Sequence, residues 1–206
     1  MPQPSDVPTG RTLVISCGAL AGEIRAITNT TGWEHVDFEY LPANFHNRPE
    51  KITPALSDLL SARASDYGQI LIGYGDCGTG GDLDRLLEHY PTAQRLPGDH
   101  CYAFFAGLDR FMEQFEGELG TFFLTDFLVR HQDALIFGSL GLSDHPELID
   151  TYFGNYSRVL YIAQSPTPDL TEAARSCAKR LNLNFDQLDV GRGHLESRIL
   201  EIRVPA

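Results

Sequence analysis

The sequence lacks the features that mark exported, membrane-spanning and disulfide-rich proteins. The first dozen residues contain no apolar run and no basic stretch, and no apolar run elsewhere approaches the roughly 20 residues that cross a bilayer. Only four cysteines are present, and they form neither a Cys-x-x-Cys pair nor the dense framework of a secreted mini-protein. We therefore expect a cytoplasmic protein without an export signal or a membrane span, whose cysteines are thiols or metal ligands.

Positive charge is also scarce. Acidic residues outnumber Lys and Arg by 28 to 16, which gives a formal net charge of −12. Such a field would repel a phosphate backbone or an anionic membrane. We therefore expect neither nucleic acid nor a membrane as a partner.

Internal repeats, low-complexity segments and linkers are absent as well. Hydrophobic residues make up 42% of the 206 residues and charged residues 21%, the usual balance of a globular protein. A chain of this length can close one sizeable core. The sequence therefore predicts a flexible leader over residues 1–11 and a single domain over residues 12–206.

Short apolar runs alternate with amphipathic segments along the chain. Runs that end at turn-forming residues predict strands over residues 12–16, 36–41, 69–75, 93–96, 158–163 and 184–188. Helices are expected over residues 20–28, 52–64, 102–115, 145–153 and 170–181, and across the aromatic stretch 120–142. This alternation predicts an α/β fold, a Rossmann-like three-layer sandwich with a mainly parallel sheet.

Residues able to bind metal or act as nucleophiles follow the first four predicted strands. They are Cys17, His46, Cys77, His100 and Cys101. Open α/β sheets bind ligands at the carboxyl ends of their strands, so we expect these five residues at one edge. Thiolate sulfur and imidazole nitrogen suit zinc, iron or cobalt. We expect the three cysteines as thiolate ligands, with one of the two histidines completing the shell.

The glycine-rich segment GYGDCGTGG has a second interpretation. Between a strand and a helix, its glycines can form a nest for an anion or a cofactor; they are Gly75, Gly78, Gly80 and Gly81. The segment has neither the lysine of a Walker loop nor the spacing of a dinucleotide fingerprint. Helix capping by Thr79 or Asp82 is the structural alternative.

A third interpretation is covalent chemistry. A cysteine at the N-terminus of a helix has a lowered pKa, which describes Cys17 and Cys77 equally well. His100 would then serve as the base. Glu23, in the predicted helix that follows Cys17, is a further candidate acid or base, although a surface or capping role is the commoner one.

Longer motifs carry a resemblance to a known family. The motifs are ISCGALAGEI, LPANFHNRPEKI, LIGYGDCGTGG, RLPGDHCYAFFAG, GTFFLTDFLVRH and HPELIDTYFGNY. Over residues 12–200 the chain resembles a bacterial and archaeal family labelled only as a domain of unknown function. These motifs contain the candidate residues Cys17, Glu23, His46, Cys77, His100 and Cys101.

The resemblance implies a metabolic setting. Members of the family look like frequent gene neighbours of corrinoid-dependent methyltransferase systems, including those for methylated amines and those of split methionine synthases. This implies one-carbon metabolism, an indirect link to cobalamin, and corrinoid methyltransferase components as partners.

We therefore expect a metal-binding protein, with zinc or iron, that acts in corrinoid-linked methyl metabolism as an enzyme or as a methyltransferase-associated protein. Two alternatives stay open at this point. One is a non-enzymatic accessory module that binds a corrinoid protein or its activator. The other is a metal-independent cysteine enzyme.

Overall fold

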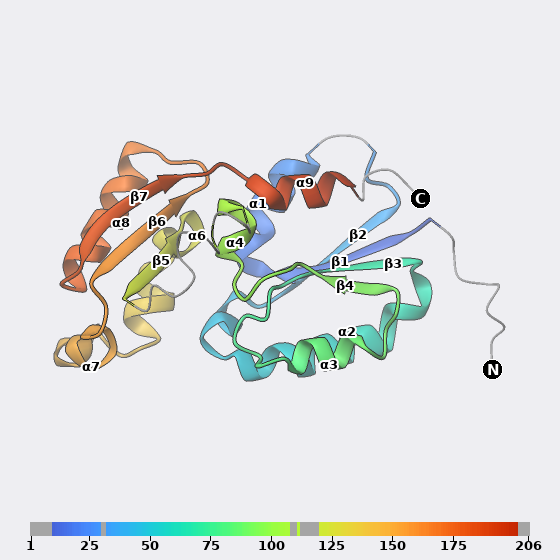
Figure 1. The fold of residues 1–206 in the computed structure, drawn as a ribbon, viewed down its shortest axis with the longest axis horizontal. Helices are drawn as coiled ribbons and strands as arrows, with labels where there is room; N and C mark the ends of the chain where they lie inside the picture. Colours follow the sequence, from blue (N-terminus) through green and yellow to red (C-terminus); the bar gives the residue numbers. More distant parts are fainter. Residues whose placement is uncertain (1–9, 30–31, 108–110, 112–119, 202–206) are drawn as a thin grey trace. The chain divides into compact units, whose positions relative to one another are not determined.

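The computed structural model describes residues 10–29, 32–107, 111 and 120–201 (Figure 1). These residues belong to two compact units. Unit 1 extends to Cys101 and takes in the residues from Leu195 onward, and unit 2 runs from Tyr102 to His194. The expected α/β fold with parallel sheets is confirmed. The expectation of a single domain stays a prediction, because two compact units can still fold together.

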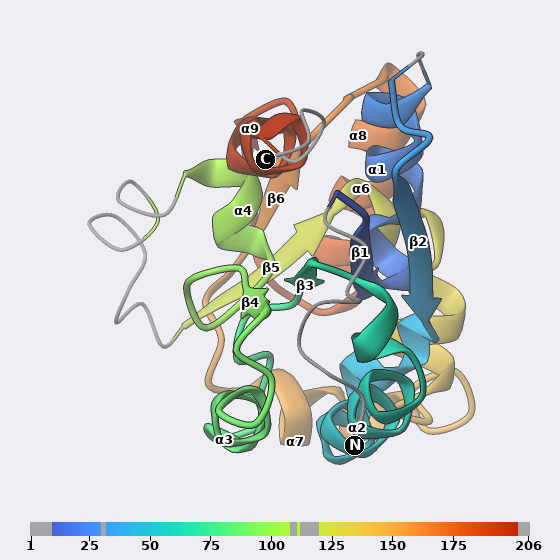
Figure 2. The ribbon, with the colours of Figure 1, turned by 90° about the vertical axis from the view of Figure 1, so that its right-hand side faces the viewer.

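Unit 1 is built on a four-stranded parallel sheet in the order β2-β1-β3-β4. Its strands are β1 (Thr12–Cys17), β2 (Val36–Leu41), β3 (Gln69–Gly73) and β4 (Ala93–Arg95). Its main helices are α1 (Ala21–Thr28), α2 (Ile52–Arg63), α3 (Asp82–Leu87) and α9 (Gly193–Glu201). Helices α1 and α9 cover one face of the sheet, and α2 and α3 cover the other (Figure 1 and Figure 2). Unit 1 is therefore a three-layer sandwich.

The central strands β1 and β3 are buried because helices cover both faces of the sheet. Leu13, Ile15 and Ile70 have no exposed surface. Burying each such side chain contributes roughly 1.5–3 kcal/mol. Helix α2 buries every fourth residue from Ile52 to Leu60, which is the spacing of one helix face.

The strand order of unit 1 reverses at the carboxyl ends of β1 and β3. The chain leaves β1 through α1 toward β2, whereas it leaves β3 through α3 toward β4, and the two helices lie on opposite faces (Figure 2). Open α/β sheets bind ligands where the strand order reverses in this way. Ser16 pairs with Gly73 at this point, so Cys17 and Tyr74 are the next residues on the two strands.

Unit 2 is built on a three-stranded parallel sheet in the order β5-β6-β7. Its strands are β5 (Thr121–Thr125), β6 (Arg158–Ala163) and β7 (Asn184–Asp189). Its helices are α4 (Tyr102–Ala106), α6 (Asp126–Arg130), α7 (Ile149–Phe153) and α8 (Pro168–Arg180). Helices α6 and α8 pack on each other and against the sheet, around a core that includes Leu124, Val159 and Cys177.

Short helical turns complete the two units. They are η1 (Gly18–Leu20), η2 (Ala43–Asn47), η3 (Pro49–Lys51), η4 (Ala64–Asp66), the π-helix η5 (Asp133–Gly138) and η6 (Pro146–Leu148). No helix in the described part of the chain is long and apolar enough to span a bilayer.

The structure corrects three expectations. The stretch 120–142 is not one helix, because residues 121–125 form β5, which pairs with β6 along its length, and α6 and η5 follow. The strands form two sheets rather than one, since β5 pairs with β6 and β4 with β3. Helix α9 adds an element beyond the last expected strand, and it buries Leu195 and Ile199 one helical turn apart.

Two other expectations fall partly outside the described residues. The helix expected over residues 102–115 is seen as α4 up to Ala106, and residues 108–110 and 112–115 are not described. Of the leader, residues 1–9 are not described.

Candidate functional site

Two loops meet at the carboxyl edge of the unit 1 sheet. The N–H group of Cys77, in the loop after β3, donates a hydrogen bond to the carbonyl oxygen of Asp99 at 2.7 Å. Gly75 permits this approach, because a Cβ atom there would lie only 2.7 Å from the carbonyl oxygen of Gly98. The loop that follows β4 is thus held against the loop that follows β3. This arrangement brings Cys77 to Cys101.

The thiols of Cys77 and Cys101 lie close enough for each to alter the pKa of the other, and both side chains are partly buried. The neighbouring Cys101 thiol is the main cause that lowers the pKa of Cys77; burial opposes it, and the backbone N–H groups of Gly75 and Cys101 add to it. The neighbouring Cys77 thiol, and secondly burial, hold the pKa of Cys101 well above its ordinary value. Of the two thiols, Cys77 is therefore the one that loses its proton first as the pH rises.

The backbone of Cys77 has a conformation that is uncommon for a residue with a side chain. Its φ is +49°, in the left-handed region, and the residue lies in the turn that joins β3 to α3. Such strain clusters at functional sites, where the surrounding structure holds it in place. Here the hydrogen bond to Asp99 does so. A strained strand-to-helix turn is one way in which α/β enzymes expose a nucleophile at the end of a sheet.

Cys17 and Tyr74 lie at the ends of the two central strands, within electrostatic reach of the pair. The Cys17 sulfur accepts a hydrogen bond from the N–H of Ala19 at 3.4 Å and so caps η1. Burial raises the pKa of Cys17. Burial, and then the neighbouring thiols, raise the pKa of Tyr74 far above its ordinary value. Both groups therefore stay protonated at neutral pH.

The Tyr74 hydroxyl is a buried polar group at this site. Tyr74 is 2% exposed, and its oxygen makes no hydrogen bond of normal geometry with the residues that the structure describes. It lies close enough to the Cys17 thiol for each group to affect the pKa of the other. A buried hydroxyl without a hydrogen-bond partner lowers the stability of the folded protein by about 1–3 kcal/mol. Such a group at the carboxyl ends of β1 and β3 therefore requires an explanation.

The two histidines of the expected site lie on exposed loops. His46 is in η2, after β2, and His100 directly precedes Cys101. Surrounding protein atoms, and secondly the charge of His100, lower the pKa of His46, so the two imidazoles are near each other. Glu23 lies in the first turn of α1 and is partly buried.

Among the residues that the structure describes, the side chains of the expected metal centre do not form a three-ligand group. Within the described ranges, no three His, Cys, Asp or Glu side chains are placed so that they could hold one metal ion. The thiols and imidazoles, as they are placed, therefore do not fit a zinc or iron centre.

The glycine-rich turn binds a carboxylate of its own chain. Asp76 accepts hydrogen bonds from the Thr79 hydroxyl at 2.8 Å and from the N–H groups of Gly81 at 2.8 Å and Gly80 at 3.1 Å. Burial acts to raise the pKa of Asp76, but these donors outweigh it and lower the pKa. Two of the N–H groups expected to bind an anion are thus already in use. Neither Thr79 nor Asp82 caps α3, because Gly81 is the N-cap residue.

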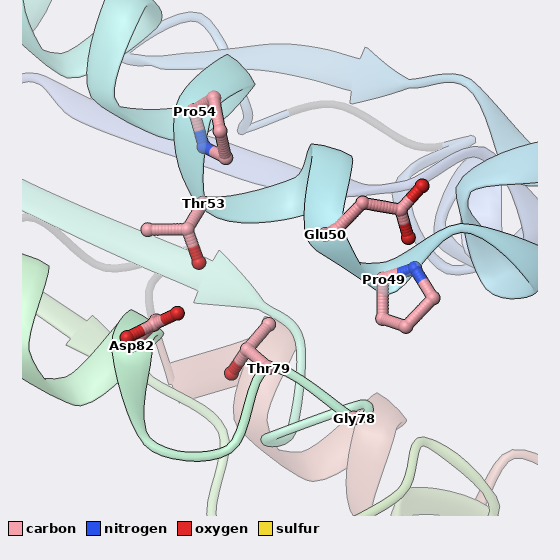
Figure 3. Close-up of a pocket in the computed structure, with 7 residues that line it drawn as sticks. All are labelled: Pro49, Glu50, Thr53, Pro54, Gly78, Thr79 and Asp82. Carbon is pink, nitrogen blue, oxygen red and sulfur yellow. The ribbon is translucent and has the colours of Figure 1, made fainter.

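A pocket of about 420 Å³ lies between this turn and the N-terminal end of α2 (Figure 3). Its lining residues are Pro49, Glu50, Thr53, Pro54, Gly78, Thr79 and Asp82. The two walls meet at Gly78, where a Cβ atom would lie 3.3 Å from the Cβ atom of Pro49. The hydroxyl of Thr53 points toward the turn in Figure 3, and its buried oxygen has no hydrogen-bond partner among the described residues. The pocket is large enough for a small ligand, and Gly78 directly follows Cys77.

Residues 40–199 match the model of a family described as a protein of unknown function, DUF1638. The chain belongs to the DUF1638 family. The match covers His46, Cys77, His100 and Cys101, whereas Cys17 precedes it. Comparisons of this DUF1638 chain with curated proteins and with solved structures found no match.

Sequence analysis did not identify two residues of this site. They are Tyr74 and Asp76. A tyrosine after a strand is ordinarily a packing residue, and only its buried hydroxyl distinguishes Tyr74. Asp76 has a signal in the sequence. Its position directly before a glycine-rich turn is the sequence pattern that indicates a carboxylate bound by the N–H groups of the turn.

Proposed function

We propose that this DUF1638 protein acts through the thiolate of Cys77, which forms a covalent bond with a small electrophilic substrate. The observation that carries the proposal is the turn after β3, which holds Cys77 against the loop of Cys101 through the hydrogen bond from the Cys77 N–H to Asp99. The nearby Cys101 thiol lowers the pKa of Cys77. The thiolate, and not the thiol, is the nucleophilic form of cysteine. The strained turn at Cys77 and the adjoining pocket support the same assignment.

The proposed step needs no separate base. The Cys77 sulfur donates an electron pair to the electrophilic carbon of the substrate, and the bond to the leaving group breaks with both electrons going to that group. Cys101 keeps its proton as the Cys77 thiolate becomes a thioether. Tyr74 keeps its proton as well, and its hydroxyl is a donor for a polar atom of the bound substrate or the leaving group.

The test is competitive alkylation of the reduced native protein with iodoacetamide near pH 7, followed by peptide mass mapping. Cys77 is expected to react first, and Cys17 and Cys177 much later, because they are 8% and 0% exposed. Cys77→Ser should remove the fast reaction, and Cys177→Ala should leave it unchanged. A Cys77 that reacts no faster than free glutathione would contradict the proposal.

The proposed setting is one-carbon metabolism, with corrinoid methyltransferase components as partners and an indirect link to cobalamin. The resemblance of the family motifs supports this setting. In it, an alkyl or methyl group on a good leaving group is the substrate class for Cys77. A non-enzymatic accessory module is the alternative, and co-purification with a corrinoid protein together with full function of the Cys77→Ser variant would favour it.

A zinc or iron site is the second proposed function. The proximity of the thiols of Cys17, Cys77 and Cys101 supports it, because sulfur is a donor that both metals accept. His46 and His100 are the further candidate ligands. Since these side chains do not form a three-ligand group as placed, metal binding would require them to move.

Elemental analysis distinguishes the two functions. The protein is purified without oxygen and without an affinity metal column, and wild type is compared with Cys77→Ser. A stoichiometric amount of zinc or iron that is lost in the variant would establish the metal site. No metal in either sample, even after reconstitution, together with fast alkylation of Cys77, would leave the thiolate function.

A further inference from the structure

The thiols of Cys77 and Cys101 lie near each other, as the two partners of a disulfide must. We propose that Cys77 and Cys101 form a reversible disulfide by exchange with a low-molecular-weight disulfide. The disulfide can form whether or not Cys77 has the proposed function. Its consequence rests on the proposed function, because the disulfide would inactivate the Cys77 nucleophile.

The first argument is proximity. A disulfide needs Cβ atoms about 3.5–4.5 Å apart, and the thiols of Cys77 and Cys101 are close enough for each to alter the pKa of the other. The backbone hydrogen bond from Cys77 to Asp99 and the close approach at Gly75 hold the two loops together. The sulfurs therefore need not be brought together from separate parts of the fold.

The second argument is access. Cys77 and Cys101 are partly buried, so a small reagent can reach the pair. By contrast, Cys17 is buried and its sulfur caps η1. Cys177 is 0% exposed in the core of unit 2. The four cysteines thus divide into one reachable pair and two buried single thiols.

The exchange proceeds in two balanced steps. The Cys77 thiolate attacks one sulfur of the reagent disulfide, a mixed disulfide forms, and one reagent thiolate leaves. Cys101 then gives its proton to a reagent thiolate, its sulfur attacks the Cys77 sulfur, and the second reagent thiolate departs. Two protein thiols are oxidised to one disulfide, and one reagent disulfide is reduced to two thiols.

The consequence for the site is direct. In the disulfide, the Cys77 sulfur is bonded to the Cys101 sulfur and is no longer a thiolate. Cys101 then has no thiol proton to donate. Reduction restores both groups together. The same pair would therefore serve as the nucleophile and as its redox control.

The test uses the full chain and oxidised glutathione as the probe, at neutral pH, with acid quenching and peptide mass mapping. Wild type should yield a linked Cys77–Cys101 peptide with the loss of two hydrogens, and should lose fast alkylation at Cys77 until dithiothreitol is added. In Cys101→Ser, a stable glutathione adduct should accumulate on Cys77, because no second thiol resolves it. Cys177→Ala, which removes a thiol buried in the core of unit 2, should behave as wild type does.

A disulfide between Cys17 and Cys77, or a glutathione adduct that persists on Cys77 of the wild type, would overturn the inference. So would the absence of any oxidation under conditions in which reduced Cys77 is alkylated fast, and that result would leave the proposed function intact. Slow alkylation of reduced Cys77 would instead count against the proposed function alone. Urea unfolding of each variant shows that a missing product does not come from misfolding.

Discussion

The hydroxyl of Tyr161 donates a hydrogen bond of 2.7 Å to Oδ1 of Asp126 in the core of unit 2. Asp126, which follows β5, is 1% exposed, and Tyr161 of β6 is 0% exposed. The N–H groups of Gln164 and Ser165, beyond the end of β6, donate to the same carboxylate at 3.0 and 2.9 Å. One buried carboxylate thus ties together the carboxyl ends of two neighbouring strands.

Replacing this carboxylate should destabilise the protein strongly. In Asp126→Asn, an amide NH₂ group would face N–H and O–H donors, so we expect a loss of about 3 kcal/mol in the free energy of unfolding. Tyr161→Phe removes a single donor and should cost about 1.5 kcal/mol. Urea unfolding followed by circular dichroism measures both. A smaller loss in Asp126→Asn than in Tyr161→Phe would show that the carboxylate is not the centre of this network.

Stability should fall in alkaline solution, in part because of Tyr161. Burial, and secondly Asp126, raise the pKa of Tyr161 in the folded protein. The contribution of such a group is fully present below the unfolded pKa of about 10, and it is lost as the pH rises through the folded value. Above about pH 10, the stability of wild type should therefore fall more steeply with pH than that of Tyr161→Phe. Tyr152→Phe, which alters a side chain that is 46% exposed, is the matched control and should follow wild type.

Two glycine substitutions should have opposite effects. A Cβ atom at Gly75 would strike the backbone of residues 98–100, so Gly75→Ala should destabilise by about 1–3 kcal/mol and slow the alkylation of Cys77 as the loops separate. Gly22, in α1, has open space around it, and Gly22→Ala should stabilise by about 0.5–1 kcal/mol. Urea unfolding and alkylation rates test both. Equal stability of the two variants would refute the close approach at Gly75.

The reactivity of Cys77 should depend on Cys101. Because the Cys101 thiol lowers the pKa of Cys77, Cys101→Ala should raise that pKa, and less thiolate should be present at neutral pH. The pH–rate profile of alkylation at Cys77 should then move to higher pH. Cys177→Ala should leave the profile where it is. If the pH–rate profile of Cys101→Ala does not shift, groups other than Cys101 lower the pKa of Cys77.

Local patterns were sufficient for most of unit 1 and for the ends of several elements. The strands at residues 36–41 and 158–163 have the expected bounds, because an alternating pattern in the first and an apolar run in the second end at residues that favour turns. The stretch 121–125 was harder, because a buried apolar run looks alike in a helix and in a strand. Pairing with β6, which comes much later in the chain, makes it a strand.

The sequence alone indicated that Cys17, His46, Cys77, His100 and Cys101 follow strands of a parallel sheet and share one edge. That inference needs only the alternation of strands and helices, which is a local property of the chain. Which of these residues touch depends on distances between segments far apart in sequence. The contact of two loops at Gly75 pairs Cys77 with Cys101, and the end of β3 buries the Tyr74 hydroxyl. Hydrogen bonds and burial act over a few ångströms, so the packed fold, rather than the order of residues, sets which cysteine has the lower pKa.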